Sequence, residues 1–421
     1  MFLYIIYVLL SPFLWFLILL TSFFNNKVKE HWNDLWISIN SVSKDLKKNK
    51  NKKKIILFHA ASAGEFEQLV PILDSIDKNK FYIVQSFFSP TIFKNHNNKN
   101  SFNSFCYHPF DFIISSYIFF KKIKPNYYII NRHDIWPSHI IMAKFFKIKI
   151  FFINANLYKK SNRLKFPFKS FNKFIFKQFD KILTPSNKIS NIMKTLINKN
   201  NIVTTGDSRF DQIYLRMKQN HHIFFKNINY ETKKIIFGSI LKSDYEIIFK
   251  FLHSYFPKGN KSLNEKQIKL IIVPHEVDNN SINELQKKLE EINIISILYN
   301  DKGNNIPNTL IVNKIGILAD LYKYSDFTYI GGGFEAGVHS VIEPSIYGSV
   351  ITYGPNIDIL DEAVYMSENN IGFIVRTYHD LIKYMNFLND HDKFLSIKKN
   401  TKKYVFKNTG ASKKILREIL N

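Results

Sequence analysis

Apolar residues run without a charged side chain from position 2 to position 24, in the segment FLYIIYVLLSPFLWFLILLTSFF. At about 1.5 Å per residue, a helix of this length crosses a ~30 Å hydrocarbon layer. A cleaved signal peptide is the alternative, but a basic region before the segment and a small-x-small cleavage site after it are both missing. Pro12 leaves open whether the helix spans the bilayer or lies obliquely in one leaflet. We expect residues 1–25 to be a membrane anchor.

Lysines follow the apolar segment directly. Lys27 and Lys29 come first, and the run KDLKKNKNKKK occupies positions 44–54. Because cytoplasmic flanks of membrane segments are rich in Lys and Arg, we expect the rest of the chain on the cytoplasmic side of the membrane. The 44–54 run could also bind anionic headgroups, at about 1 kcal/mol per lysine. A solvated linker is the alternative for this run.

Further along the chain, short apolar runs alternate with amphipathic stretches of helical length. The run IILFHAAS (55–62) is followed by EFEQLVPILDSI, in which Phe66, Leu69, Val70 and Leu73 share one helical face. Similar apolar runs recur at 81–88, 126–131, 148–156 and 180–186. Strands that alternate with helices predict a parallel, doubly wound sheet.

A polar stretch rich in Asn and Lys around 217–234 separates this series from a second one. The second series of apolar runs lies at 233–239, 268–276, 292–298, 309–314, 327–333 and 349–355. Two tandem Rossmann-like domains with a cleft between them are typical of the GT-B fold. We therefore expect an α/β chain with domains over 26–220 and 221–421, and we leave open whether the last helix packs back on the first domain.

Length and composition agree with two domains. A chain of 421 residues exceeds the ~250–300 at which a single core stops growing. The hydrophobic fraction of 45% supplies material for two interiors. The lone Cys106 excludes an internal disulfide and fits a reducing compartment.

The net charge of +25, from 59 basic and 34 acidic residues, would attract phosphate groups on nucleic acid, lipid or a small substrate. Only six of the basic residues are arginine, and Lys, Asn, Ile and Phe are all abundant, as an AT-rich genome would produce. A nucleic-acid-binding protein would gather arginines and aromatic residues on one face, whereas these lysines are spread over both halves. We therefore expect no nucleic-acid partner.

Glycine is scarce but concentrated. Six of the 14 glycines fall within 331–354, where GGGFEAGVHSVIEPSIYG follows an expected strand and is expected to open a helix. Free amides at a helix N-terminus can hold an anion. Glu343, one expected helical turn after His339, could accept hydrogen bonds from ribose hydroxyls. This combination predicts a nucleotide-sugar pocket; a tight strand-to-helix turn with no ligand is the alternative.

The turn HAASAGE at 59–65 is the second candidate site. Ser62 and Glu65 form a capping box, which alone would explain Glu65. Gly64, however, lets a substrate approach the backbone, and the turn ends the first strand, at the edge where open α/β sheets bind ligands. A helix N-terminus also keeps a carboxylate ionised, as a general base requires. Histidines such as the His221–His222 pair lack metal-site spacing, so we expect no metal.

Six blocks occur in order along the chain: HAASAGEFEQLVP (59–71), NRHDIWP (131–137), TGDSRFD (205–211), GSILKSDYE (238–246), VPHEVDN (273–279) and YIGGGFEAGVHSVIEPSIYGSVITYGPN (329–356). With the N-terminal apolar segment they closely resemble the 3-deoxy-D-manno-octulosonic acid (Kdo) transferases, over essentially the whole chain. GDSRFD and GGGFEAGVHSVIE are most similar to the Bacteroidota branch. No block is diagnostic alone, but six in order with matching spacing are specific.

The resemblance implies a GT-B glycosyltransferase that needs neither a metal nor another cofactor. Such an enzyme transfers Kdo from CMP-Kdo to a lipid A precursor, lipid IVA, in lipopolysaccharide biosynthesis at the inner membrane. Its expected partners are therefore CMP-Kdo, the lipid acceptor and inner-membrane lipids. A membrane-associated GT-B enzyme that uses a UDP- or GDP-sugar is the alternative.

The same resemblance implies catalytic residues in the first domain. Glu65 matches the general base that deprotonates the 6′-hydroxyl of the distal glucosamine. Arg209 stands where the family has a lysine that stabilises the transition state, and it keeps the positive charge. Arg132 and Asp134 replace two glutamates of the family, which leaves the role of this pair open.

The resemblance also implies a CMP site in the second domain. Its residues are Pro274, His275, Ile315, Gly316, Ile317, Ser340, Val341, Ile342 and Glu343. His275 replaces an arginine that is common in the family, and Ser340 replaces an asparagine. Both changes could alter the affinity for the donor.

Overall fold

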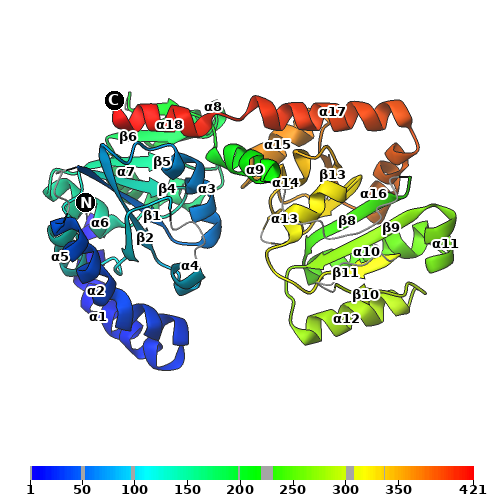
Figure 1. Ribbon diagram of the computed structural model, residues 1–421, viewed down its shortest axis with the longest axis horizontal. Coiled ribbons are helices and arrows are strands. Elements are labelled where there is room, and N and C mark those ends of the chain that lie inside the picture. Colours follow the sequence, from blue (N-terminus) through cyan, green and yellow to red (C-terminus); the bar gives the residue numbers. More distant parts are fainter. Residues whose placement is uncertain are drawn as a thin grey trace. The chain divides into compact units, whose positions relative to one another are not determined.

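The computed structural model describes residues 2–48, 53–95, 100–197, 200–219, 231–299, 308–335 and 337–421. It divides into two compact units, Met1–Gln212 with Thr409–Asn421, and Ile213–Asn408 (Figure 1). The domain boundary predicted between 220 and 221 and part of the 44–54 lysine run lie outside the described residues. The end of the chain, which includes the last helix, belongs to the first unit. The last helix therefore packs back on the first domain, a question that the sequence leaves open.

The first unit is built on a parallel seven-stranded sheet. Its strands are β1 (Lys54–Ala60), β2 (Phe81–Phe87), β3 (Ser104–Tyr107), β4 (Tyr127–Asn131), β5 (Lys149–Ile153), β6 (Lys181–Thr184) and β7 (Ile202–Thr204). In the order β3-β2-β1-β4-β5-β6-β7, Phe58 of β1 pairs with Gln85 of β2 and Ile129 of β4. The direction of winding reverses between β1 and β4, so the carboxyl ends of these strands form the switch point at which open α/β sheets bind ligands.

Helices cover both faces of this sheet (Figure 1). One face packs against α2 (Asn26–Lys47), α5 (Ile113–Ile123), α6 (Pro137–Phe145), α7 (Phe168–Phe176) and α8 (Asn187–Leu196). The other packs against α3 (Ala63–Asp74), α4 (Pro90–Asn95) and the last helix, α18 (Ala411–Leu420). Phe152 in the first layer and Phe66 in the second are fully buried, so each face has its own apolar core, which is the main stabilising contribution.

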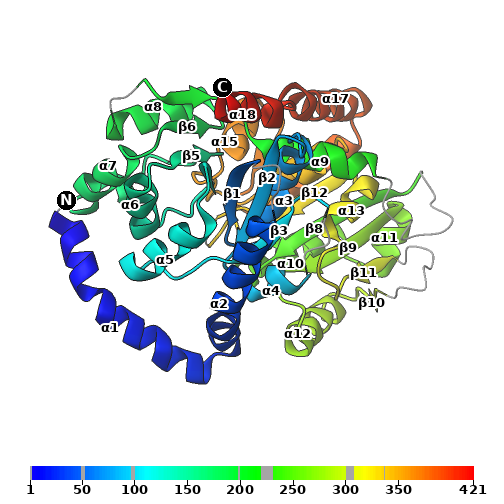
Figure 2. The same cartoon turned by 60° about the vertical axis from the view of Figure 1, so that its left-hand side comes forward.

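The N-terminal helix α1 (Phe2–Phe24) is followed by Asn25, whose side chain caps α2 by accepting the amides of Lys27 and Val28. Among the described residues, Leu3–Phe24 is the one helix whose length and composition suffice to cross a membrane. Apolar side chains along it are exposed, as with Phe24 at 90%. Figure 2 shows α1 and α2 as two arms that diverge from the turn between them.

The second unit holds another parallel seven-stranded sheet. Its strands are β8 (Lys233–Ile240), β9 (Ile268–Pro274), β10 (Ile297–Leu298), β11 (Thr309–Ile311), β12 (Phe327–Ile330), β13 (Val350–Tyr353) and β14 (Phe373–Ile374). The order is β10-β11-β9-β8-β12-β13-β14, so the winding reverses between β8 and β12.

Helices cover the second sheet as well. One face packs against α10 (Lys242–Tyr255), α11 (Asn260–Glu265), α12 (Asn279–Glu290), α16 (Tyr378–Met385) and α17 (His391–Lys407). The other face packs against a smaller cluster that includes α13 (Leu318–Leu321). The remaining helices are α9 (Ser208–Lys218), α14 (Ile342–Ser345) and α15 (Asp361–Glu368).

The predicted fold class is confirmed, because both units are α/β with parallel, doubly wound sheets. The sequence pattern does not predict β3, β7 or β14, which have four, three and two residues. It predicts β10 over 292–298, whereas the strand is confined to Ile297–Leu298.

Candidate active site

Glu65 lies in the first turn of α3, just beyond the carboxyl end of β1. Ser62 Oγ accepts the amide of Glu65 at 3.4 Å, and Glu65 Oε2 accepts the amide of Ala61 at 2.8 Å. The predicted capping interaction therefore exists. The Glu65 side chain, however, accepts the amide of Ala61, one residue before the N-cap Ser62, rather than that of Ser62 itself. A Cβ at Gly64 would meet nothing within 4 Å, so the turn has open space beside it.

Two effects raise the pKa of the Glu65 carboxyl above its usual range. Burial is the larger, and the negative charge of Asp134 is the second. The amide of Ala61 and the charges of His59 and Arg132 oppose them. A carboxylate with a raised pKa is a stronger base than an ordinary glutamate, which suits proton abstraction from a hydroxyl.

Asp134 and Arg132 follow β4, on the other side of the switch point. Asp134 Oδ2 lies 3.1 Å from Nε2 of His59, a residue of β1. Arg132 has a left-handed backbone conformation, with φ of 60°, and its Nε donates to His133 Nε2 at 3.2 Å. Because the charges of both residues act on Glu65, the structure brings these three predicted residues together at the ends of β1 and β4.

Arg209 is bound to Asp207. Its Nε and Nη2 donate to Asp207 Oδ2 at 2.9 and 2.6 Å. Burial alone would raise the pKa of Asp207, but the charge of Arg209 and its hydrogen bonds outweigh burial and hold that pKa below its usual range. The charge of Arg132 also lowers the pKa of Asp207, so the fourth predicted residue lies in the same electrostatic neighbourhood.

Buried amides join the elements around the switch point. Gln68 Nε2, on α3, donates to Asp207 Oδ1 at 2.8 Å, and Asn131 Nδ2, at the end of β4, donates to Gln68 Oε1 at 3.3 Å. Asn154 Nδ2 donates to Asn131 Oδ1 and to Ser208 Oγ, both at 2.9 Å. These mutually satisfied polar groups fix four chain segments in one arrangement. Sequence reasoning misses them, although Asn131 and Asn154 stand in predicted strands close to their carboxyl ends.

A row of buried histidines extends from Asp134 into the interior of the first unit. His59 Nδ1 and His108 Nδ1 lie 3.2 and 3.1 Å from Ser86 Oγ. The rings of His59 and His108 stack at 3.8 Å, and those of His108 and His139 at 4.3 Å. Burial lowers the pKa of His108 well below its usual range, so this ring is neutral. Only His59 falls in a sequence block that suggests a site.

The far end of this row reaches α1. His139 Nδ1 lies 2.9 Å from Asp111 Oδ1, and Tyr7 Oη donates to Asp111 Oδ2 at 2.8 Å. The N-terminal helix therefore contacts the same polar network that orients Asp134.

In the second unit, His275 follows β9, beside the switch point between β8 and β12. Its Nδ1 lies 2.9 Å from Ser239 Oγ, and its ring stacks on His339 with centroids 4.8 Å apart. Pro274 lines a cavity of about 220 Å³ together with Glu335 and residues of α10. The sequence predicts Pro274 and His275 but assigns no role to Ser239. The sequence feature that could have identified Ser239 is its position at the end of the apolar run that forms β8.

Ile315, Gly316 and Ile317 form the loop after β11. The carbonyl of Gly316 accepts a hydrogen bond from Arg216 Nη2 at 3.3 Å, and Arg216 Nε donates to Asp320 Oδ1 at 2.9 Å. Ile315 is 80% exposed, whereas Ile317 is buried. The ion pair of Arg216 and Asp320, both in the second unit, therefore holds this loop in place.

The prediction of a helix directly after the glycine-rich turn is wrong. α14 begins only at Ile342 and has four residues. The amide of His339 donates back to the carbonyl of Gly331 at 3.2 Å, so the backbone cannot enter a helix there. His339 and Glu343 consequently do not share a helical face, and the predicted anion site at a helix N-terminus has no support.

The predicted residues Ser340, Val341, Ile342 and Glu343 differ in accessibility. Val341 and Ile342 have fully buried side chains, so they could contact a ligand only through the backbone. Ser340 and Glu343 are half-buried. The charge of Glu343 acts on the hydroxyl of Tyr322, which lies against the end of β8, so Glu343 is near that strand.

Close packing explains the clustered glycines. A Cβ at Gly331 would lie 2.3 Å from the carbonyl oxygen of Ser239, and one at Gly333 would lie 2.6 Å from Gly354. Gly332 has φ of 88°, a conformation that other residues rarely adopt. The fold of the second unit therefore requires glycine at these positions whether or not a ligand binds. This agrees with the alternative that the glycines form a tight turn with no ligand.

The first unit thus combines a base of raised pKa with two guanidinium groups, and the second offers a histidine pair beside a small cavity. Such a set can deprotonate a hydroxyl and stabilise developing negative charge. In the described part of the chain, no group of three or more His, Cys, Asp or Glu side chains could hold a metal ion.

Residues 39–212 match the family model described as 3-Deoxy-D-manno-octulosonic-acid transferase (kdotransferase). The chain is 28% identical over 357 residues to the 3-deoxy-D-manno-octulosonic acid transferase of Aquifex aeolicus, covering 84% of this chain and 89% of the relative. The chain is similar to the Kdo transferases. The transferase of Rickettsia prowazekii is 24% identical over 389 residues, which cover 87% of this chain and 78% of that protein. The predicted family resemblance is confirmed, and the family match contains Glu65, Arg132, Asp134 and Arg209.

Solved structures of low sequence identity share the fold of this chain. The UDP-GlcNAc 2-epimerase of Neisseria meningitidis bound to UDP-GlcNAc is 13% identical with a TM-score of 0.63, covering 87% of this chain and 99% of that one. MurG of Acinetobacter baumannii is 11% identical with a TM-score of 0.55, at the same coverages of 87% and 99%. These likenesses confirm the predicted GT-B type of fold.

Proposed function

We propose that this chain transfers Kdo from CMP-Kdo to the lipid A precursor lipid IVA in lipopolysaccharide biosynthesis, with Glu65 as the general base. One observation carries the proposal. Glu65, with a raised pKa, stands with Asp134 and Arg132 at the switch point of the first sheet, inside the segment that matches the family model. Ligands of open α/β sheets bind at this edge.

In the proposed reaction, Glu65 removes the proton of the acceptor hydroxyl as its oxygen bonds to the anomeric carbon of Kdo. The bond from that carbon to the phosphate oxygen breaks, and CMP leaves with the electron pair. We assign the stabilisation of developing negative charge to Arg132, whose charge acts on Glu65, and to Arg209, which is held by Asp207. CMP leaves as a phosphate monoester and carries less charge than a diphosphate, which supports a reaction that needs no divalent ion.

The second unit is the proposed donor domain. His275 and Ser239 stand at the carboxyl ends of β9 and β8, the sheet edge where a nucleotide is expected to bind. The backbones of Gly316 and Val341, and the side chains of Ser340 and Glu343, are the proposed contacts of CMP. In this arrangement Val341 acts through its amide, because its side chain is buried.

A lipid acceptor supports a position at the membrane. α1 has the length and composition to cross a bilayer, and the lysines after it favour the cytoplasmic side. We therefore propose that both units work at the cytoplasmic face of the inner membrane.

Product mass analysis tests the donor, the acceptor and the metal requirement together. The full chain, in detergent, is incubated with CMP-Kdo and lipid IVA, with and without EDTA. We expect lipid IVA to gain the mass of Kdo in both conditions. A product that forms only from a UDP- or GDP-sugar would establish the alternative transferase, and loss of product with EDTA would contradict metal independence.

Substitutions of Glu65 separate its two roles. Glu65→Gln keeps an oxygen that accepts the amide of Ala61 but removes the base, whereas Glu65→Ala removes both. We expect both variants to lose about 10²–10⁴-fold in kcat while keeping CMP binding. Glu67→Gln, an exposed residue of the same helix turn, is the matched control and should retain activity. Activity retained in Glu65→Gln would reduce Glu65 to a capping residue.

A further inference from the structure

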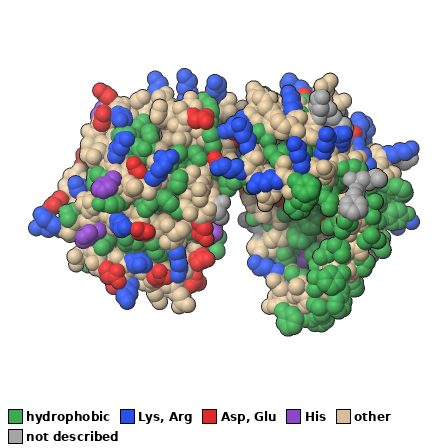
Figure 3. All heavy atoms as spheres, turned by 180° about the vertical axis from the view of Figure 1, so that it is seen from behind, with side chains coloured by type: hydrophobic (Ala, Val, Ile, Leu, Met, Phe, Trp, Pro, Cys, Tyr) green, Lys and Arg blue, Asp and Glu red, His purple; other side chains and the backbone are tan. Residues whose placement is uncertain are grey.

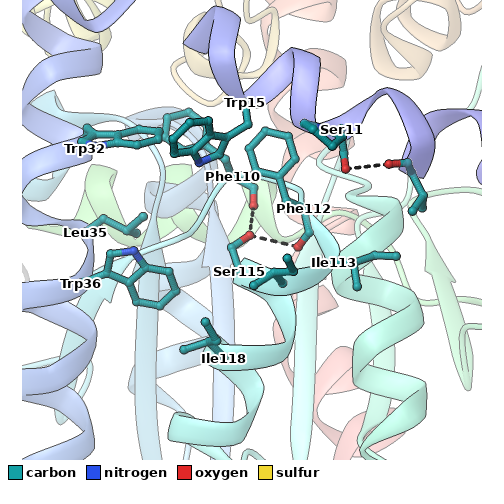
Figure 4. Close-up of a pocket in the computed structure, with 13 residues that line it drawn as sticks. Ser11, Trp15, Trp32, Leu35, Trp36, Phe110, Phe112, Ile113, Ser115 and Ile118 are labelled. Carbon is teal, nitrogen blue, oxygen red and sulfur yellow. Dashed lines mark hydrogen bonds between the residues drawn. The ribbon is translucent and has the colours of Figure 1, made fainter. Parts of the chain in front are cut away.

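A cavity of about 590 Å³ lies between α1, α2 and α5 of the first unit (Figure 4). Its volume falls within the ~300–1,000 Å³ that small-ligand sites span. The side chains that define its character are Val8, Trp15, Trp32, Trp36, Phe112 and Ile118. Three of the four tryptophans of the chain therefore line one cavity.

The wall of this cavity offers carbon surface. Among the described residues that line it, none carries a charge. Its two serine hydroxyls are used locally, because Ser11 Oγ donates to the carbonyl of Val8 and Ser115 Oγ donates to that of Phe110, both at 2.7 Å (Figure 4). Trp15 of α1 meets Trp32 edge to face, with ring centroids 5.4 Å apart. Such a wall suits a hydrocarbon chain rather than a polar ligand.

The cavity adjoins the apolar outer surface of α1. Leu9 is 73% exposed and Phe13 61%, and Figure 3 shows apolar side chains gathered over this helix at the lower right. Ile114 of α5, at the cavity wall, is 74% exposed. The surface that a bilayer would cover therefore continues from α1 across the cavity to α5.

We propose that this cavity binds one acyl chain of a membrane glycerophospholipid. The proposal requires α1 to lie in the bilayer but does not depend on the sugar that the enzyme transfers. A glycerophospholipid surrounds such a helix at all times, whereas an acceptor substrate visits it transiently, so mass action favours the former. A bound chain would fill the space between α1 and the rest of the unit and stabilise their contact.

Tryptophan fluorescence tests the proposal, because bromine atoms on an acyl chain quench indole rings on contact. The full chain, in a detergent without bromine, is titrated with phosphatidylethanolamine that carries brominated acyl chains. We expect saturable quenching with one lipid bound per chain. Val8→Phe places a ring inside the cavity and should weaken this binding roughly tenfold, the loss expected when about two methylenes are excluded.

Leu9→Phe is the matched control, because it adds the same ring to the next residue, on the outer face of α1. It should bind the brominated lipid as the natural chain does. Ile118→Phe, which fills the cavity from α5, repeats the test if Val8→Phe fails to fold. Quenching that does not saturate, or that is equal in all variants, would overturn the proposal. Native mass spectrometry that finds a bound acceptor-type lipid in place of a glycerophospholipid would also overturn it.

Discussion

At the scale of single residues, the base strength of Glu65 depends on Asp134. Burial raises the pKa of Glu65, and the charge of Asp134 raises it further. Asp134→Asn removes that second effect and leaves the first, so the pKa of Glu65 should fall. Because the proposed general base works only when deprotonated, we expect the acidic limb of the kcat/KM profile to move to lower pH. Initial rates of Kdo transfer measured across the acidic range check this.

A carboxylate of the same unit that lies away from Glu65 serves as the control for this shift. Asp77, at the amino end of β2, is 46% exposed. Asp77→Asn should leave the acidic limb where it is. An unchanged limb in Asp134→Asn would show that Asp134 does not set the pKa of Glu65.

The ion pair of Asp207 and Arg209 makes a prediction about stability. The pKa of Asp207 lies below its unfolded value near ~3.9, so the pair stabilises the fold fully above that value and its contribution is lost as the pH falls through the folded pKa. Asp207→Asn leaves the guanidinium, 17% exposed, without its charged partner. We expect a loss of about 3–5 kcal/mol at pH 7, measured by urea unfolding in detergent, and a smaller difference from the natural chain in acid.

An equal loss at every pH would contradict this account, because it would mean that the charge of Asp207 contributes nothing. Asp392→Asn, an exposed carboxylate of α17 in the second unit, is a suitable control and should change stability little.

Residues that the local sequence pattern marks could be predicted as site residues. Residues whose role depends on the tertiary arrangement of distant segments could not. Glu65 follows a strand and caps a helix, so the local sequence marks it. His59 and Asp207 belong to the candidate site because β1, β4 and the start of α9 lie together at one edge of the sheet. The local sequence around each residue does not indicate this arrangement. The resemblance to a family supplied Arg132, Asp134 and Arg209, which periodicity alone does not distinguish from other surface charges.

At the scale of elements, α18 supports the helix that carries Glu65. Ile415 is fully buried in the core that includes Leu69 of α3. Asp211, at the start of α9, accepts the amides of Gly410 and Ser412, which fixes the beginning of α18. The last helix is therefore part of the framework of the candidate site, although it is the most distant part of the chain in sequence.

Ile415→Ala should destabilise the first unit by about 2–5 kcal/mol, because it leaves a cavity between α18 and α3. Transfer activity should fall at temperatures where the natural chain is still active. Lys413→Ala, on the exposed face of the same helix, is the control and should change neither property. Thermal inactivation of both variants, followed by transfer activity, checks the prediction. Equal half-lives for Ile415→Ala and the natural chain would show that α18 does not support the site.

Elements with long, regular patterns could be predicted from the sequence, such as β1, β8 and α3. The segment after β12 could not, because its conformation depends on distant contacts. Gly333 packs on Gly354, and the amide of Gly332 donates to Asp244 at 3.0 Å. These contacts hold an irregular loop where the local sequence favours a helix.

At the scale of the whole molecule, an apolar helix and a basic surface could each hold the protein at a membrane. The net charge of +25 attracts anionic headgroups, but this attraction is screened by salt. Insertion of α1 is hydrophobic and is not screened. The two contributions can therefore be separated by ionic strength.

Vesicle flotation at low and at ~1 M salt, where the screening length falls to about 3 Å, measures which contribution dominates. We expect the full chain to float with anionic vesicles in both conditions. A chain without residues 1–25 should float at low salt through its lysines and be released at high salt. This truncation uncovers Trp32 and Trp36, so it must be handled in detergent and checked for folding by circular dichroism. A folded truncated chain that stays on the vesicles at high salt would show that α1 is not the sole anchor and that the apolar surface of α2 and α5 also enters the bilayer.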